Sequence, residues 1–451
     1  MKHFFYPKNV AVVGASRRPH TVGHDIVKNL LDGGVLKTKF NRPYKGRLYL
    51  VNPNADQVLG IKCYNSLLKI KNKIDLVIIA VPANIVPKIV KDCIKKRVKA
   101  VIIISAGFAE TGLGGKELQD HISLLLKKAK IPLLGPNCLG VINTQIMNAS
   151  FAPTTPPKGK VAFITQSGAL ADSVVDWAVE QKFGFSKIIS VGNSANLDVG
   201  DFIDYLAKDK ETKTIAIYLE ALKNGRGFIK SAQKCKKPII VLKGGKTENG
   251  KTAVSSHTGS LAGNYEIYKA AFHQAKVLLV SSIEELFESA RLLAKYKRIK
   301  NNIAIITNGG GCGVLAADIF QELEINLAKL SKKTLNKIER KMHPAYSRKN
   351  PLDIVGDASS FKYDAALNAV LSQKNISGII VLQTLQTMTN PIENAKVIIK
   401  ASKKFPKKPI ISVFMGGTFT KKGKHFLEAH NLPVYNFPKE GGLAIKSLIK
   451  K

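Results

Sequence analysis

The architecture of the chain can be read from the stretch Val161-Ala162-Phe163-Ile164-Thr165-Gln166-Ser167-Gly168-Ala169-Leu170. A short apolar, β-branched run leads into a turn of small residues, and a helical pattern follows. Two other segments open in the same way, with Val10-Ala11-Val12-Val13 before Gly14-Ala15-Ser16 and Ile303-Ala304-Ile305-Ile306 before Thr307-Asn308-Gly309. Such an opening is typical of the first strand, turn and helix of a doubly wound parallel domain. The sequence therefore predicts an α/β protein built from consecutive Rossmann- or flavodoxin-like domains.

The spacing of these openings predicts the domain organisation. They recur at intervals of about 140 to 150 residues, which is the size of one such domain. Turn-forming residues lie between them, near Pro156-Pro157-Lys158-Gly159 and near residues 297–302. We therefore expect three domains, at residues 1–150, 151–298 and 299–451.

Composition narrows the class of protein. The chain has 451 residues and a formal charge of +38, and its lysines are spread along the sequence. Because aromatic residues are not interleaved among them, the pattern does not favour nucleic-acid binding. A general lysine bias explains the charge, which would also help to attract a polyanionic ligand.

Targeting and metal-binding signals are lacking in the sequence. The N-terminus is too short and too polar for a signal peptide, and no apolar run approaches the roughly 18 residues of a membrane helix. The five cysteines are scattered without a CxxC pair, so neither a metal site nor a disulfide framework is expected. We expect a cytoplasmic protein that binds neither membrane nor nucleic acid.

The first domain is expected to hold a ligand at the ends of its strands. Strands are predicted at residues 47–51, 76–81 and 98–105, and each ends in turn-forming residues. The turn that begins at Gly14 does not fit the GxGxxG fingerprint, and Asn52 stands where an NAD site needs an acidic residue. Nicotinamide chemistry is therefore disfavoured. A nucleotide with its phosphates near Arg17 and Arg18 remains open.

A histidine-containing stretch, Ser255-Ser256-His257-Thr258-Gly259-Ser260-Leu261-Ala262-Gly263, follows the apolar run at residues 238–242. We expect a buried strand that ends in a polar loop. Glycines admit a ligand close to the backbone, and the hydroxyls can hold phosphate oxygens. An imidazole there can serve as general base, metal ligand or phosphoryl acceptor. A solvated surface histidine is the alternative.

Other polar groups are expected at the same kind of sheet edge. The residues that follow Thr165 and Thr307 open helices whose unpaired N–H groups make anion sites. The strand predicted at residues 214–219 ends at Glu220, which points to a cleft. A surface acid preceding Lys223 and Arg226 is the alternative for Glu220.

Several of these motifs occur in one order that is familiar as a whole. The chain resembles the α subunit of the ADP-forming acyl-CoA synthetases (acetate–CoA ligase, ADP-forming), which are relatives of succinyl-CoA synthetase. The resemblance lies in residues 10–23, 135–140, 164–170, 218–221, 255–263, 307–313 and 350–353. Each stretch alone is a weak signal, but together they span essentially the whole chain.

The resemblance implies the roles of individual residues. The first domain of this family binds CoA, and the matching positions are Gly14, Ala15, Ser16, Gly23, Pro53, Pro82, Ser105, Gly107, Phe108 and Asn137. The family's phosphorylated histidine corresponds to His257, and the glutamate that orients it corresponds to Glu220. Phosphate would be bound by Gln166, Ser167, Gly168, Ala169, Ser256, Thr258, Gly259, Gly309, Gly310 and Gly311.

The resemblance also implies a partner. Members of this family bind ADP or ATP with Mg²⁺ on an ATP-grasp domain, which is a β subunit or a fused C-terminal half. No segment of this sequence matches it, so we expect an ATP-grasp β subunit and an α₂β₂ assembly. CoA and a small acid would be the substrates, and the sequence does not indicate which acyl group is used.

Three other functions remain as alternatives. A non-catalytic CoA-sensing module would bind CoA without being phosphorylated. A succinate-type CoA ligase would share the chemistry, but its α subunit usually ends after two domains. A nucleotide-dependent oxidoreductase is disfavoured by the missing fingerprint.

Overall fold

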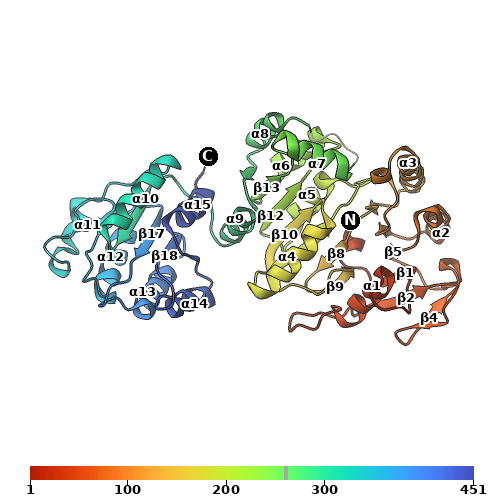
Figure 1. Cartoon of the computed structure of the whole chain (residues 1–451), viewed down its shortest axis with the longest axis horizontal. Coiled ribbons are helices and arrows are strands. Elements are labelled where there is room, and N and C mark those ends of the chain that lie inside the picture. Colours follow the sequence, from red (N-terminus) through yellow and green to blue (C-terminus); the bar gives the residue numbers. More distant parts are fainter. Residues whose placement is uncertain (259–262, 451) are drawn as a thin grey trace. The chain divides into compact units, whose positions relative to one another are not determined.

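The computed structural model describes residues 1–258 and 263–450, with the side chains of residues 255–258 left out of the description. The chain divides into two compact units, Met1–Ala290 and Arg291–Lys451, and each is considered by itself (Figure 1). Three mostly parallel sheets alternate with helices, which confirms the predicted fold class. No helix in the described part of the chain is long and apolar enough to cross a membrane.

The first sheet has the order β3-β4-β2-β1-β5-β6-β7 and is parallel except for the β3–β4 hairpin. Its strands are β1 (Asn9–Val13), β2 (Arg47–Val51), β3 (Gln57–Val58), β4 (Ile61–Tyr64), β5 (Leu76–Ile79), β6 (Ala100–Ile103) and β7 (Leu133–Leu134). The helices are η1 (Lys2–Phe4), α1 (Val22–Asp32), η2 (Leu67–Lys69), η3 (Ala83–Ile85), α2 (Val86–Lys96), η4 (Ala109–Thr111) and α3 (Leu113–Lys128). Because β1 lies between β2 and β5, the strand order reverses there, and ligands bind at such a switch point.

The second sheet has the order β14-β13-β12-β10-β11-β8-β9. Its strands are β8 (Gly140–Asn143), β9 (Met147–Ser150), β10 (Lys158–Thr165), β11 (Phe185–Ser190), β12 (Thr214–Leu219), β13 (Ile239–Lys243) and β14 (Leu278–Val280). The helices are α4 (Gly168–Glu180), α5 (Val199–Lys208), α6 (Gly225–Lys234), α7 (Glu248–Thr258), α8 (Tyr265–Gln274) and α9 (Ile283–Lys295). The antiparallel β8–β9 hairpin, from residues expected to close the first domain, extends this sheet beside β11.

The third sheet, in the second unit, is wholly parallel and has the order β16-β15-β17-β18-β19. Its strands are β15 (Ile303–Thr307), β16 (Leu352–Asp353), β17 (Gly378–Gln383), β18 (Ile410–Phe414) and β19 (Val434–Tyr435). The helices are α10 (Gly310–Glu322), α11 (Lys332–Asn336), η5 (Glu339–Lys341), α12 (Ser360–Ser372), α13 (Pro391–Lys404), α14 (Lys421–Ala429) and α15 (Pro438–Leu448). Helix α10 packs against α15, and α12 packs against α13.

The prediction of a polar loop at residues 255–263 is wrong for residues 255–258, which are helical. Helix α7 begins at Glu248, and its backbone continues to Thr258. An acidic first turn favours this helix, since Glu248 lies at the positive end of the helix dipole. Lys251 Nζ also approaches Glu248 Oε1 to 2.6 Å on the same face of the helix.

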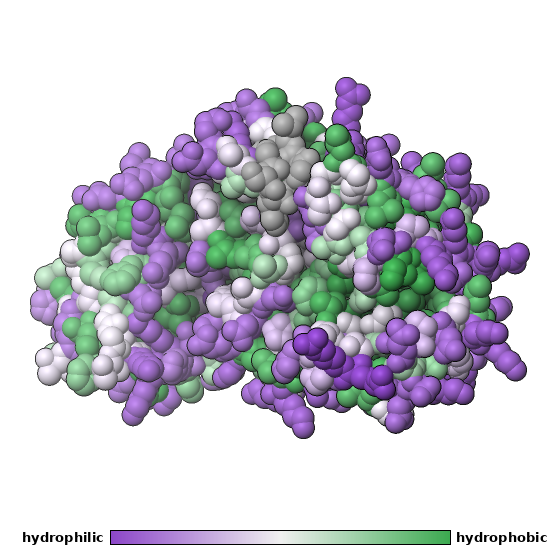
Figure 2. Space-filling view, turned by 45° about the vertical axis from the view of Figure 1, so that its right-hand side comes forward, coloured by the Kyte–Doolittle hydropathy of each residue, from purple (hydrophilic) through white to green (hydrophobic). Residues whose placement is uncertain are grey.

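The apolar strands are buried on both faces, which is why they read as continuous runs. Val10 and Val12 belong to one core, and Ala11 and Val13 belong to another. The core that holds Val10 and Val12 also contains residues from the second sheet, such as Ile164. One shared core therefore makes residues 1–290 a single compact unit. Hydrophilic side chains are scattered over the face drawn in Figure 2, as the spread of lysines along the sequence suggests.

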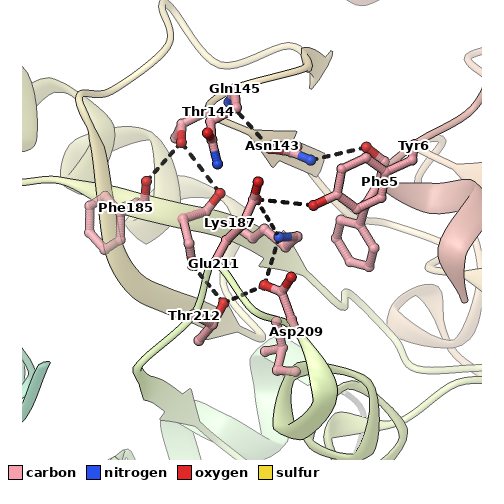
Figure 3. Close-up of polar contacts among 12 residues, drawn as sticks. Phe5, Tyr6, Asn143, Thr144, Gln145, Phe185, Lys187, Asp209, Glu211 and Thr212 are labelled. Carbon is pink, nitrogen blue, oxygen red and sulfur yellow. Dashed lines mark hydrogen bonds and ion pairs between the residues drawn. The ribbon is translucent and has the colours of Figure 1, made fainter.

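A buried lysine ties the N-terminal segment to the second sheet (Figure 3). The side chain of Lys187 on β11 is fully buried, and its Nζ lies 2.7 Å from Asp209 Oδ2 and 3.1 Å from Glu211 Oε2. The hydroxyl of Tyr6 donates to the same oxygen of Glu211 over 3.0 Å. Burial alone would lower the pKa of Lys187, but the hydrogen bond and charge of Asp209 outweigh it and raise that pKa. The ammonium group is therefore held in its charged form.

We predict that Lys187→Met destabilises the protein by about 3 kcal/mol, because Asp209 would be left as a buried carboxylate without its cation. Urea unfolding followed by circular dichroism measures the change. Lys396→Met is the matched control, since Lys396 forms an exposed pair with Glu393. Its expected effect is within about 0.5 kcal/mol. Equal effects of the two substitutions would contradict the structural role of Lys187.

Candidate active site

Two glycines shape the turn after β1. Gly14 has φ +95°, and its N–H donates to the carbonyl of Val51 over 2.9 Å. A Cβ atom on Gly14 would lie 2.2 Å from the carbonyl oxygen of Ala80, and one on Gly23 would lie 1.9 Å from the carbonyl oxygen of Gly14. Neither position admits a side chain, so helix α1 begins directly against the turn.

The side chain of Asn52 links the turns after β1 and β2. Its Nδ2 donates to the carbonyl of Ala15 over 2.7 Å, and its Oδ1 accepts from the N–H of Asn54 over 2.8 Å. Arg17 reaches across to the carbonyl of Asn54 over 3.2 Å. Ser16 is turned to its own loop, where its Oγ accepts from the N–H of Arg18. Asn52 is therefore a structural link between the two turns.

The remaining strands of the first sheet bring their turns to the same edge. Pro53 and Pro82 follow β2 and β5, and both are exposed. Ser105 follows β6, and its Oγ donates to the carbonyl of Val81 over 2.6 Å. Since these strands are parallel, the sequence-predicted positions after β1, β2, β5 and β6 line one edge of the sheet.

The turn at Gly107 and Phe108 is held by an acidic residue that the sequence analysis missed. Glu110 Oε1 accepts from the N–H groups of Gly107 and Phe108, over 2.6 and 3.1 Å. Burial would raise the pKa of Glu110, but hydrogen bonds from Asn193 and from these N–H groups outweigh it and lower that pKa. The side chain of Phe108 is fully buried in the core, so only its backbone faces the turn.

Asn193 connects the edges of the first two sheets. Its Nδ2 donates to Glu110 Oε2 over 2.5 Å, and its Oδ1 accepts from Asn137 Nδ2 over 3.3 Å. Its carbonyl accepts from Lys223 Nζ over 2.7 Å. Asn137 is fixed in turn by its N–H, which donates to the carbonyl of Ser105. The turn after β6 and the turn after β12 are thus joined through one residue, by the side chain and the carbonyl of Asn193.

Glu220 lies at the carboxyl end of β12 and is only 4% exposed. Gln166 holds its backbone, because Gln166 Oε1 accepts from the N–H groups of Glu220 and Ala221 over 2.5 and 3.0 Å. Gln166 Nε2 also donates to the carbonyl of Ala221 over 2.7 Å. The structure therefore brings two predicted site residues together, but the Gln166 side chain is engaged with the backbone of the Glu220 turn.

Three further residues surround Glu220. Lys243 is buried, and its Nζ donates to the carbonyl of Glu220 over 2.8 Å. Burial lowers the pKa of Lys243 to about 8, against the opposing charge of Glu220. Burial, the charge of Glu220 and a hydrogen bond to it raise the pKa of Tyr218 to about 12. A Cβ on Gly244 would lie 3.0 Å from the Tyr218 hydroxyl, so this glycine leaves room for the pair.

Side chains hold the turn at the start of α4, where the sequence predicts an anion site. Thr165 Oγ1 accepts from the N–H of Ser167, and Ser167 Oγ accepts from the N–H of Leu170. The N–H groups of Gly168 and Ala169 are in the first helical turn, where no intrahelical acceptor exists. They can bind an anion together with the positive end of the helix dipole.

The start of α10 repeats this arrangement in the other unit. Thr307 Oγ1 accepts from the N–H of Gly309, and the amide of Asn308 bonds both the N–H and the carbonyl of Thr384. A Cβ on Gly310 would lie 2.9 Å from Asp353 Oδ2, whereas Gly311 has open space around it.

The predicted residues Ser256, His257, Thr258 and Gly259 have side chains or positions outside the described part of the chain. The backbone of α7, which contains residues 256–258, packs against η4. Since η4 directly follows Gly107 and Phe108, this helix lies next to the turn after β6.

Comparison with known proteins defines the class first. Three family models match consecutive parts of the chain: a CoA binding domain at residues 8–144, a succinyl-CoA ligase like flavodoxin domain at residues 158–293, and a ligase-CoA domain at residues 303–449. The turns of the first sheet lie within the first match, the Glu220 turn and the start of α4 lie within the second, and the start of α10 lies within the third.

Individual relatives extend over the whole chain. The chain is 40% identical to the acetate–CoA ligase [ADP-forming] II subunit alpha of Pyrococcus furiosus, across 100% of this chain and 98% of that protein. It is 41% identical to acetate–CoA ligase [ADP-forming] I of Archaeoglobus fulgidus, but there it spans only 63% of the relative's length. The solved structure of the dinucleotide forming acetyl-coenzyme A synthetase 1 of Ca. Korarchaeum cryptofilum, in complex with phosphate and ADP, matches with a TM-score of 0.92 and 35% identity. That match covers 99% of this chain and 96% of the solved one. The chain belongs to the ADP-forming acetate–CoA ligase family.

We predict that Gly23→Ala weakens CoA binding at least tenfold, because the new methyl group would collide with the carbonyl of Gly14 and displace the turn. Isothermal titration with CoA measures the dissociation constant. Gly114→Ala is the matched control, since that helical glycine has open space around it. Unchanged CoA affinity in Gly23→Ala would show that this turn does not contact the ligand.

Proposed function

We propose that this chain is the α subunit of an ADP-forming acetate–CoA ligase, which converts acyl-CoA, ADP and phosphate into the free acid, CoA and ATP. The observation that supports this proposal best is the buried Glu220, held at the edge of the second sheet by Gln166 and Lys243. A carboxylate so placed is suited to orient a histidine that accepts a phosphoryl group. The family resemblance assigns that histidine to His257.

The proposed reaction has three steps. A phosphate oxygen attacks the thioester carbonyl, the C–S bond breaks, and acyl phosphate and CoA thiolate form. A neutral nitrogen of His257 then attacks the phosphorus of the acyl phosphate, and the acid leaves as its carboxylate. The phosphoryl group finally passes from His257 to the terminal phosphate of ADP.

Each part of the described site has a task in this scheme. The edge of the first sheet, from Gly14 to the Gly107 turn, would bind CoA. The carboxylate of Glu220 would accept a hydrogen bond from one ring nitrogen of His257, which leaves the other nitrogen unprotonated for attack. The first turn of α4 would neutralise the transferring phosphoryl group without a mobile cation, and the first turn of α10 offers a second site of the same kind.

We also propose a partner. The chain matches an α subunit almost end to end but spans 63% of the A. fulgidus relative. An ATP-grasp β subunit that binds ADP and Mg²⁺ would supply the last step, in an α₂β₂ assembly. We further propose that residues 1–150, 151–298 and 299–451 act as the CoA-binding, phosphohistidine and second helix-terminus domains.

We predict that the purified chain, given acetyl-CoA and radiolabelled phosphate, takes up an acid-labile, base-stable label. His257→Ala should abolish the label, because it removes the acceptor nitrogen. Glu220→Gln should slow labelling about 100-fold or more, because an amide cannot hold the same tautomer. Phosphorylation is followed by autoradiography after electrophoresis.

His273→Ala is the matched control, since His273 is an exposed histidine of α8 in the same unit. It should label like the wild type. Retained label in His257→Ala would contradict the assignment. An unlabelled wild-type chain that still binds CoA, even with an ATP-grasp partner present, would indicate a CoA-sensing module instead.

A further inference from the structure

We propose that Lys243 and Tyr268 are positioning residues, which fix the backbone of the Glu220–Leu222 turn and so aim the Glu220 carboxylate at the histidine. This inference rests on the proposed function, because it assigns the support of the same site. Neither residue belongs to a motif that the sequence analysis singled out.

The backbone of the turn is bonded by side chains on every side. The side chain of Gln166 accepts hydrogen bonds from the N–H groups of Glu220 and Ala221, and it donates one to the carbonyl of Ala221. Lys243 Nζ donates to the carbonyl of Glu220 over 2.8 Å. The N–H of Leu222 donates to the hydroxyl of Tyr268 over 3.1 Å. Three side chains therefore bond five consecutive backbone N–H and carbonyl groups of the turn. They are Gln166, which precedes α4, Lys243 at the end of β13, and Tyr268 in α8.

Lys243 and Tyr268 also support each other. The ammonium group of Lys243 lies 4.6 Å from the centre of the Tyr268 ring, which is cation–π distance. It donates a further hydrogen bond to the carbonyl of Gly244. A Cβ on Gly263 would lie 2.9 Å from the same ring, so the backbone just before α8 packs closely against Tyr268. The tyrosine thus contacts the Glu220 turn with its hydroxyl and the start of α8 with its ring.

The third sheet shows that the fold does not require this lysine. Strand register pairs Thr165 with Tyr218 and Leu219 with Lys243 in the second sheet. The same register pairs Thr307 with Leu382 and Gln383 with Phe414 in the third sheet.

The positions of Tyr218, Glu220 and Lys243 are therefore occupied in the third sheet by Leu382, Thr384 and Phe414. There the amide of Asn308 bonds the N–H and the carbonyl of Thr384, and the neutral hydroxyl of Thr389 also donates to that carbonyl over 3.4 Å. A turn of this kind can therefore form without a buried charge. We infer that Lys243 is present because of the Glu220 carboxylate and not because the fold requires it.

The test uses the full chain and the labelling assay with acetyl-CoA and phosphate. Tyr268→Phe removes only the acceptor for Leu222 and keeps the ring beside Lys243. We expect about a tenfold slower histidine phosphorylation with an unchanged CoA dissociation constant, because positioning affects the chemical step and not ligand binding. Lys243→Met should slow labelling more strongly.

Tyr265→Phe is the matched control, because Tyr265 lies three residues earlier in α8 and the substitution keeps its ring, whose centre is 5.8 Å from Lys246 Nζ. Thermal melting of each variant checks that the fold is kept. If Lys243→Met does not fold, Tyr268→Phe alone decides. Wild-type labelling rates in Tyr268→Phe would overturn the inference while leaving the proposed function intact, whereas an unlabelled wild-type chain would overturn the proposed function itself.

Discussion

The candidate site depends on one constraint, the fixed backbone of the turn that carries Glu220. Burying a carboxylate costs free energy unless the group is paired or hydrogen-bonded, so its surroundings must be fixed. Here the turn is bonded by Gln166 from the start of α4 and by Lys243 from the end of β13. Because both anchors lie on the edge of a parallel sheet, the geometry of the strands is passed directly to the carboxylate. Such preorganisation is what electrostatic catalysis of phosphoryl transfer requires.

A comparison of the second and third sheets distinguishes the contacts that the fold requires from those that the proposed chemistry requires. Both use a threonine at the end of the first strand to close its own turn, and both use the next amide to reach the neighbouring strand. These shared contacts build the scaffold. By contrast, the two buried ionisable residues of the Glu220 turn, Glu220 and Lys243, are replaced at the equivalent positions of the third sheet by Thr384 and Phe414. The same backbone plan thus serves an acidic centre in one domain and a neutral helix terminus in the other.

Much of this fold follows from local sequence, and most of the site does not. The three strand–turn–helix openings were predicted because β-branched runs and small-residue turns are local signals, and the strands Arg47–Val51 and Thr214–Leu219 occur where they were expected. The β8–β9 hairpin was not expected beside β11, since pairing between distant strands leaves no local pattern. The helical backbone up to Thr258 was hidden by its serines and threonines, which are typical of loops. Glu110, Asn193 and Tyr268 escaped notice because their importance lies in contacts across the fold.

The most direct test of this account is a crystal structure of the full chain after phosphorylation by acetyl-CoA and phosphate. The account predicts phosphorus on one ring nitrogen of His257 and a carboxylate oxygen of Glu220 within about 3 Å of the other nitrogen. It also predicts that Gln166 and Lys243 keep their bonds to the Glu220 turn. Phosphorus on a different side chain, or a Glu220 carboxylate turned away from the imidazole, would contradict it.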